Sequence, residues 1–546
     1  MLQPTRRQNH HRRSSALHLL LIAAIALWLA GCASLPDSVQ RPVSHALQQA
    51  ETTRLGRSVA EHMASTGQRH SSGFRLIGAT EAAYTSRLSL IDAADRTLDL
   101  QYYAILADPS TGLLLQRLRD AAARGVRVRM LLDDFNTTGA NAQVLRLAFV
   151  PNIEVRLYNP LPGSRRSLAG RLLGSLGNIE QAQRRMHNKM FIADNTLGIT
   201  GGRNLGDAYF GQGRDSNFID LDVLAAGRIV RAMSASFDAY WNNDLAYPVQ
   251  SLLTPGELDA LKKADDPLDR PDADPGTPLL DLSPARLTWA PALLLVDKAD
   301  KIASEQEGQG DTVVDGLLRL MAATREDLFI VSPYFVPGEP MMEIFAQLRR
   351  AGVRVRVLTN SLASNDAPLA HVGYARYRKR LLEMGVELYE MRAEPGAAGS
   401  ALGSGSGSGS GGMARVARRG SESSTPREPG AGGSVGASSR ASLHAKTLVL
   451  DHSLLVVGSM NLDLRSQLQN SELALLIRSS TLAHQVEQGA RPVLEQDTYR
   501  MALEDGQLVW NPPDGPPIRS HFEPDAGLGM QWLLKLIGPL APDEML

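Results

Sequence analysis

The chain has 546 residues, of which 43% are hydrophobic and 21% charged, with a formal net charge of −1 and a single cysteine. At about 100–200 residues per domain, this length predicts about two to four domains, and the composition is that of a folded chain. One cysteine excludes a disulfide framework and any zinc or iron–sulfur site built from several cysteines. The near-neutral charge disfavours a dedicated nucleic-acid binder, which usually carries a basic excess.

Residues 1–31 have the pattern of an export signal. Four arginines and no acidic residue precede an apolar run over 19–30, and Gly31-Cys32 follows it. A basic start, an apolar stretch of about 7–15 residues and small residues at the exit are typical of a secretory signal. The run is too short for a comfortable membrane span. A buried helix is the alternative, which the basic flank disfavours.

The end of this signal, Leu29-Ala30-Gly31-Cys32, resembles the bacterial lipobox. The resemblance implies cleavage before Cys32 and acylation of this residue, so that the chain would be exported and anchored by lipid in the bacterial cell envelope. Ala33 and Ser34 after the cysteine favour the periplasmic face of the outer membrane over the inner membrane. Loss of the four arginines would lower the net charge from −1 to −5, which further disfavours nucleic acid as a partner.

Composition shifts divide the rest of the chain into five predicted parts. A tether with a helical segment is expected over 32–72, followed by a first lobe over 73–254. A proline- and aspartate-rich connection over 255–290 leads to a second lobe over 291–519. The tail over 520–546 contains an amphipathic stretch, for which docking onto a lobe and contact with a bilayer are both open.

The two lobes repeat one pattern of strands and helices. In each lobe a strand, a helix with apolar residues at three- and four-residue spacing, a glycine and a second strand follow one another, and a third strand comes later. Such units favour parallel strands joined by a right-handed crossover. The predicted fold class is α/β, with two pseudo-repeated lobes, each a mixed and mostly parallel sheet flanked by helices. The strands are expected at 97–103, 124–133 and 153–158 and at 327–334, 351–360 and 386–391.

The second lobe contains an insertion over 395–440. The distance from Gly125 to His187 is 62 residues, whereas the matching distance from Gly352 to His444 is 92, an excess of 30. Residues 403–412 are almost entirely alternating glycine and serine, and large apolar residues are nearly absent from the segment. Such a tract cannot offset the entropy of ordering, which predicts a flexible loop. A lid over the site is the alternative.

A His-x-Lys-x-x-x-x-Asp motif occurs once in each lobe, and an asparagine follows at the same distance. One copy would be noise, but two copies in the two halves of a repeat indicate a shared site. Alternation places the histidine and the lysine on one face of a strand. The candidate residues are His187, Lys189, Asp194 and Asn204 in the first lobe and His444, Lys446, Asp451 and Asn461 in the second.

These residue types suit the cleavage of a phosphodiester. Lysine and asparagine side chains can donate hydrogen bonds to the phosphate oxygens, and the lysines also neutralise the charge that builds up there. One histidine can attack phosphorus while the other protonates the leaving oxygen. Each histidine needs an orienting acid, and the candidates are Asp220, 33 residues after His187, and Glu472, 28 residues after His444. This chemistry requires no metal or other cofactor, and no metal motif is visible.

The paired motif resembles the phospholipase D superfamily over residues 73–519. Five segments, at 98–103, 201–207, 332–337, 373–378 and 442–446, are similar to bacterial cardiolipin synthases, in particular to their C-type branch. Those of the more familiar kind begin with membrane-spanning helices, whereas this chain begins with a lipoprotein signal.

The resemblance implies that the two motifs meet at the lobe interface and that the enzyme transfers a phosphatidyl group through a phosphohistidine. It implies that His187 is the nucleophile and His444 the acid and base, and that Asp194 and Asp451 hold the motif strands. Tyr103 and Tyr334 end equivalent strands, where they either line the cleft or belong to the core.

The expected reaction makes cardiolipin from phosphatidylglycerol and a second phospholipid. Phosphatidylglycerol and phosphatidylethanolamine both remain open as the donor. The alternatives are a phospholipase D hydrolase that releases phosphatidic acid and, from another class, a non-catalytic envelope lipoprotein. The sequence specifies no protein partner.

Overall fold

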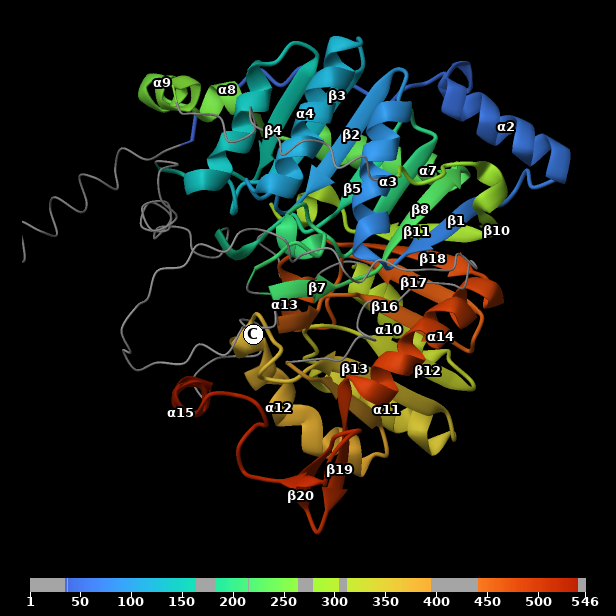
Figure 1. Ribbon diagram of the computed structural model, residues 1–546, viewed down its shortest axis with the longest axis vertical. Helices are drawn as coiled ribbons and strands as arrows, with labels where there is room; N and C mark the ends of the chain where they lie inside the picture. Colours follow the sequence, from blue (N-terminus) through green and yellow to red (C-terminus); the bar gives the residue numbers. More distant parts are fainter. Residues whose placement is uncertain are drawn as a thin grey trace, which may run out of the picture.

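The computed structural model in Figure 1 describes residues 35–36, 38–163, 182–214, 216–263, 278–303, 312–393 and 440–538. The predicted signal over 1–31 and the predicted lipidation site Cys32 lie outside the described residues, as do residues 395–439 of the glycine- and serine-rich segment. Within the described ranges, none of the helices combines the length and the apolar content that a membrane span needs.

The first lobe is a nine-stranded sheet with helices against it. Its order is β10-β1-β8-β6-β5-β2-β3-β4-β9, so that residues of the predicted connection add strand β10 to one edge. The strands are β1 (Ser72–Ile77), β2 (Thr97–Tyr102), β3 (Arg127–Asp133), β4 (Ile153–Tyr158), β5 (Met190–Ala193), β6 (Leu197–Gly201), β8 (Asp222–Gly227), β9 (Ala246–Pro248) and β10 (Thr288–Ala290). The α-helices of this part are α2 (Arg54–Thr66), α3 (Thr80–Ala93), α4 (Pro109–Ala123), α7 (Arg228–Trp241), α8 (Val249–Leu252) and α9 (Pro255–Lys263).

The second lobe is a ten-stranded sheet in the order β11-β18-β17-β16-β12-β13-β14-β19-β20-β21. The strands are β11 (Ala292–Val296), β12 (Asp327–Val331), β13 (Arg354–Asn360), β14 (Glu387–Met391), β16 (Thr447–Leu450), β17 (Leu454–Gly458), β18 (Leu473–Arg478), β19 (Thr498–Glu504), β20 (Gln507–Asn511) and β21 (Ile518–Arg519). The α-helices are α10 (Val313–Ala322), α11 (Gly338–Arg350), α12 (Pro368–Glu383), α13 (Leu464–Leu468), α14 (Ser480–Gln496) and α15 (Leu528–Ile537).

The predicted α/β fold with two related lobes is confirmed. The glycines that follow the ends of the first crossover helix in each lobe also lie where the sequence predicts them. Helix α4 begins with a capping box in which Asp108 and Thr111 satisfy each other's backbone N–H groups. Gly125 follows α4 with φ 93°, and Gly352 follows α11 with φ 83°. Only glycine adopts this left-handed region at low cost, so each helix ends there and the chain turns into the next strand.

The expectation that each sheet is mostly parallel is wrong. Among the described strands, only β2–β3 and β3–β4 in the first sheet and β12–β13 and β13–β14 in the second pair in parallel. Helical crossovers impose parallel pairing, but the motif strands are joined by tight hairpins instead. Asp194 and Asn195 turn between β5 and β6 with φ 51° and 49°, and Asp451 and His452 turn between β16 and β17 with φ 47° and 53°.

The two lobes are joined by a cluster of buried apolar side chains and by a small sheet with one strand from each lobe. A single cluster of buried side chains includes Met190 and Val223 from the first sheet and Val449 and Leu455 from the second. Strands β7 (Ser216–Ile219) and β15 (Arg440–Leu443), one from each lobe, pair in parallel. Figure 1 shows β7 at the level where the two sheets meet. The strands that carry the motifs therefore approach each other across the interface.

Candidate active site

His187 is fixed by the second lobe. Its backbone N–H donates to the carbonyl of Ser471 at 2.9 Å. Its Nδ1 lies 3.0 Å from Oε1 and 3.1 Å from Oε2 of Glu472, the next residue after Ser471. The histidine is buried, with 9% of its surface exposed.

His444 is fixed by the first lobe in the same way. Its backbone N–H donates to the carbonyl of Ile219 at 2.8 Å. Its Nδ1 lies 2.6 Å from Oδ2 of Asp220, the next residue after Ile219. His444 is 5% exposed. Each histidine thus binds the backbone of the opposite lobe and the carboxylate that follows the bound carbonyl.

The two orienting acids therefore cross the interface. Both acids predicted from the sequence do contact a histidine, but Asp220 contacts the histidine of the second lobe and Glu472 that of the first. Because each carboxylate accepts the Nδ1 proton, it fixes the tautomer and leaves Nε2 for chemistry. Neither half of the repeat contains a complete site.

The two carboxylates have different surroundings. Glu472 accepts hydrogen bonds from the hydroxyls of Ser459 and Ser466 in addition to His187. Asp220 accepts the N–H of Leu221 at 2.7 Å and packs against Gly202. A Cβ at Gly202 would lie 2.4 Å from Oδ1 of Asp220, so this glycine is required for the close approach.

Both motif lysines are buried beside their histidines. Lys189 Nζ donates to the carbonyl of His187 at 2.8 Å, and Lys446 Nζ donates to the carbonyl of His444 at 2.6 Å. Both lysines are 1% exposed. Two ammonium groups in one dry site create a field that favours an anion such as a phosphodiester.

Burial sets the protonation states of the histidines and lysines. Desolvation lowers the pKa of His187 to about 4, against the pull of Glu472, and it lowers the pKa of His444 well below its usual value. Desolvation likewise lowers the pKa of Lys189 to about 7 and shifts that of Lys446 downward. Both imidazoles are therefore neutral near pH 7 before an anion binds.

The two motif asparagines are buried within the site. Asn204 Oδ1 accepts from the N–H of Ala104 at 3.2 Å, and its amide donates to the hydroxyl of Tyr209 at 3.0 Å. Asn461 is 6% exposed, and its Oδ1 has no hydrogen-bond partner among the described residues. Both ends of the Asn204 side chain are thus engaged, whereas the Asn461 oxygen is a buried acceptor without a partner in the described part of the chain.

The motif aspartates lie at the far end of the motif strands, away from the histidines. Asp194 accepts from the backbone N–H groups of Asp95, Arg96 and Thr97. Asp451 accepts in the same way from three consecutive N–H groups, those of residues 325–327. Each carboxylate ties the end of its motif strand to the start of the neighbouring strand, which is a structural task.

The two tyrosines at the strand ends differ. The Tyr103 ring lies edge-on to His187 with 5.1 Å between centroids, and Lys189 Nζ lies 5.6 Å from its centroid. Tyr334 instead donates its hydroxyl to Asp366 at 2.8–2.9 Å. Asp366 acts on the pKa of His444, raising it against the effect of burial. Tyr103 lines the site directly, and Tyr334 reaches it through Asp366.

Sequence reasoning missed two aromatic residues around His444. The ring of Phe218 lies 5.0 Å and that of Tyr209 5.4 Å from the His444 ring, centroid to centroid. Phe218 stands two residues before Asp220, so the alternation of a strand places both on one face and could have identified it. Neither Tyr209 nor Asp366 belongs to a motif, and only the fold brings them to the site.

One group of side chains in the described part of the chain has the spacing of a metal site, and it lies outside this cleft. Asp327, His452 and Glu487 bring one ligand atom each within 4.8 Å of one another. Arg356 already provides a cation there, with its Nη2 2.6 Å from Asp327 Oδ2 and 3.3 Å from Glu487 Oε1. The group is a set of ion pairs rather than an active-site metal centre.

Comparison with known proteins agrees with this geometry. A family profile described as "Cardiolipin synthase, PLD-like domain" matches residues 88–241, 317–400 and 417–491. The chain is 37% identical to cardiolipin synthase C of Escherichia coli (strain K12), over 74% of this chain and 81% of that protein. It is 22% identical to a cardiolipin synthase of Geobacillus kaustophilus (strain HTA426), over 87% of this chain and 75% of that protein.

A solved structure shares the fold. The phosphatidylserine synthase of Haemophilus influenzae Rd KW20 superposes with a TM-score of 0.55 at 13% identity, covering 89% of this chain and all of that one.

Proposed function

The chain belongs to the phospholipase D-like family of cardiolipin synthases, as a phospholipase D-type phosphatidyltransferase, and on this premise we propose that it makes cardiolipin. The donor is a phospholipid, phosphatidylglycerol or phosphatidylethanolamine, and the acceptor is the free glycerol hydroxyl of phosphatidylglycerol. One observation carries the proposal: each motif histidine is held at Nδ1 by the acid of the other lobe, in a site that also contains both lysines.

The first step forms a covalent intermediate. His187 Nε2 attacks phosphorus, the bond from phosphorus to the headgroup oxygen breaks, and protonated His444 gives its Nε2 proton to that oxygen. The positive charge of the phosphohistidine lies next to Glu472, whose carboxylate is 3.0 Å from Nδ1 of His187. This contact stabilises charge that exists only after attack, so it lowers the barrier.

The second step transfers the phosphatidyl group. His444, now neutral, takes the proton of the acceptor hydroxyl, whose oxygen attacks phosphorus and releases His187. The low pKa of His444 makes it a strong acid once protonated, and a bound phosphodiester anion favours the protonated form. Lys189 and Lys446 hold the phosphate oxygens through both steps.

We further propose that the enzyme acts in the bacterial cell envelope. The signal-like residues 1–31 and the lipobox-like residues before Cys32 support export and attachment by acyl chains. Two or more acyl chains give a stable anchor, and Ala33 and Ser34 favour the outer membrane.

The test is an assay of lipid products with the full-length protein in mixed micelles. Labelled phosphatidylglycerol is supplied with and without phosphatidylethanolamine, to wild type, His187→Ala and His444→Ala. We expect cardiolipin from wild type and at least about a thousandfold less from each variant, because removal of either acid–base or nucleophilic group disables the chemical step.

The matched control is His484→Ala, which removes an exposed histidine on α14 and should leave the rate unchanged. Phosphatidic acid as the sole product would replace the transferase with a hydrolase. An absence of turnover with every lipid would contradict the proposed reaction.

A further inference from the structure

Most of the exposed large apolar side chains of the described residues lie on or beside helix α15. The helix alone contributes five of the eleven, and Trp532 and Leu536 are 64% and 74% exposed. A sixth, Phe522, comes from the segment before α15, and Lys535 lies near both its ring and that of Trp532. A scattered exposed leucine is ordinary, but a contiguous apolar patch marks a binding surface. The α15 patch is defined as Phe522, Leu528, Met530, Trp532, Leu533 and Leu536.

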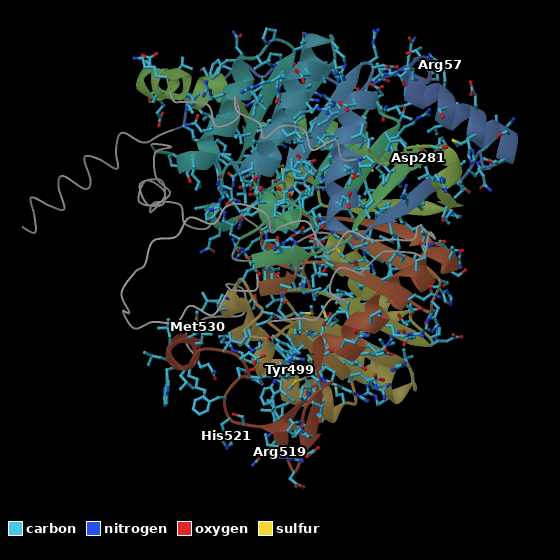
Figure 2. The ribbon with its side chains drawn as sticks, in the orientation of Figure 1. Arg57, Asp281, Tyr499, Arg519, His521 and Met530 are labelled. Atoms are coloured by element: carbon cyan, nitrogen blue, oxygen red, sulfur yellow. The ribbon has the colours of Figure 1, made fainter. Side chains whose placement is uncertain are left out.

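Helix α15 docks onto the second lobe by its opposite face. Gln531 and Leu534 are buried, and Gln531 bonds to the carbonyls of Glu523 and Ala526. Arg376 of α12 donates to the carbonyl of Gly538 at the end of the helix. A cavity of about 520 Å³ remains between α12 and α15. Figure 2 shows Met530 at the outer margin, farther from the centre of the lobe than Tyr499.

The charges around the patch suit an anionic lipid surface. Lys535 Nζ lies 4.4 Å from the ring centroid of Phe522 and 5.9 Å from that of Trp532. The nearby acids are already engaged, since Glu523 pairs with Arg378 at 2.6 Å and Asp525 accepts from the hydroxyl of Tyr499. A lysine among tryptophan, phenylalanine and leucine is the composition of a helix that lies in a membrane interface.

Helix α12, on which α15 packs, begins close to the active site. Asp366, which accepts from Tyr334 and acts on the pKa of His444, stands two residues before α12. Leu369 lies in the first turn of α12, one turn before Val372, and Val372 lines the cavity beneath α15. Helix α12 therefore packs beneath α15, and it begins two residues after an acid that acts on the catalytic histidine.

We propose that the α15 patch lies in the interfacial layer of a phospholipid bilayer and holds the catalytic site close to its lipid substrates. The inference rests on the proposed function, because it is a lipid substrate that must pass from the bilayer to the histidines. Contact of α15 with the bilayer would set the orientation of the catalytic site as well as its distance from the membrane.

The first test measures the depth of Trp532 without any turnover. Full-length protein is reconstituted with vesicles of phosphatidylethanolamine and phosphatidylglycerol whose acyl chains carry bromine, a fluorescence quencher. The difference between wild type and Trp532→Phe isolates the emission of Trp532. We expect this emission to be quenched and shifted to shorter wavelength. Unquenched Trp532 emission, from protein on or off the vesicles, overturns the proposal, and neither result depends on the reaction.

The second test separates the bilayer from the chemistry. Leu533→Gln/Leu536→Gln should lower turnover of lipid in vesicles about tenfold, because apolar contact with the acyl region is lost. Turnover of a short-chain phospholipid below its micelle concentration should stay unchanged. The control is Leu293→Gln, which alters a 57% exposed leucine of β11 outside the patch. Unchanged vesicle turnover would overturn the proposal and indicate that the patch serves another contact, such as one with a second copy of the chain. An equal loss on both substrates would also overturn it and indicate that the leucines stabilise the fold.

Discussion

The two lobes repeat one motif, yet they build unequal halves of the site. His187 is oriented by Glu472, which two serine hydroxyls support, whereas His444 is oriented by Asp220, which a backbone N–H and a close glycine support. Aromatic rings of Phe218 and Tyr209 surround only His444. The repeated motif places the two histidines in equivalent positions. The surrounding residues that differ between the lobes give each histidine a different environment and thereby a different role.

The outer faces of the lobes differ in a related way. Arg129 on β3 and Arg356 on β13 occupy equivalent positions of the repeat. Arg129 pairs with Asp99 and Asp238 and also donates to the carbonyl of Ser44, in the segment before α2. Arg356 pairs with acids too, but a cavity of about 650 Å³ remains open beside it. The segment before α2 thus packs on the first lobe, and no segment among the described residues is seen to cover Arg356 in the same way.

The largest expected effect comes from the acids. Glu472→Gln and Asp220→Asn should each lower kcat about 10²- to 10⁴-fold, because an amide no longer enforces the tautomer or balances imidazolium charge. Nitrogen-15 NMR of labelled histidine tests the crossed pairing in the same variants. Glu472→Gln should perturb chiefly the His187 resonances and Asp220→Asn chiefly those of His444. If Glu472→Gln instead perturbed chiefly His444 and Asp220→Asn chiefly His187, each acid would orient the histidine of its own lobe.

Arg129→Met and Arg356→Met should separate the two outer faces by stability. Arg129 is fully buried, so its loss strands two carboxylates and should cost about 3–5 kcal/mol. The side chain of Arg356 is 12% exposed beside an open cavity, where water can solvate the abandoned acids, so the cost should be about 1–2 kcal/mol. Thermal unfolding of both variants provides the measurement. Equal losses of unfolding free energy in the two variants would show that contact with the segment before α2 does not make Arg129 more important for stability than Arg356.

The pH profile of kcat/KM reports the free enzyme. Attack requires neutral His187, so the rate should rise as this group loses its proton near pH 4. The first step also requires protonated His444, whose pKa lies well below its usual value, and phosphate binding requires protonated Lys189. The rate should therefore fall as His444 loses its proton and fall more steeply as Lys189 loses its proton near pH 7. Each required group adds a change of about tenfold per pH unit beyond its own midpoint. A profile that keeps rising through pH 9 would mean that Lys189 is not needed in charged form.

The smallest expected effect concerns the support of Glu472. Ser459→Ala removes one hydroxyl hydrogen bond to a carboxylate that Ser466 and His187 still contact, so kcat should fall about three- to tenfold. The equivalent residue of the first lobe is Gly202, and Gly202→Ala should cost more, because the added carbon would meet Asp220. Steady-state kinetics of the two variants compares the support of the two acids. Equal, near-wild-type rates would remove the asymmetry between them.

Sequence patterns predicted the features that depend on interactions between residues close together in the chain. The spacing of the motifs identified His187 and His444, and glycine placed the ends of α4 and α11, because these features depend on nearby residues. The parallel majority was mispredicted, since hairpins at Asp194 and Asp451 reverse the motif strands.

The crossed acids could not be read from the chain. In the sequence, each acid lies closest to the histidine of its own lobe. In the structure, backbone hydrogen bonds from His187 to Ser471 and from His444 to Ile219 place each acid beside the histidine of the other lobe. These contacts join residues more than two hundred positions apart, and only the interface between the lobes creates them.

The central claim is that His187 carries the phosphatidyl group and His444 moves the proton, and trapping the intermediate tests it most directly. Wild type and His444→Ala are mixed with labelled phospholipid, quenched under alkaline conditions that preserve phosphohistidine, digested and examined by mass spectrometry. The account predicts a phosphatidyl adduct on the peptide that contains His187 in wild type, and much less of it in His444→Ala because the proton donor for the first step is missing. An adduct on His444 in wild type, or rapid turnover with no histidine adduct, would contradict it.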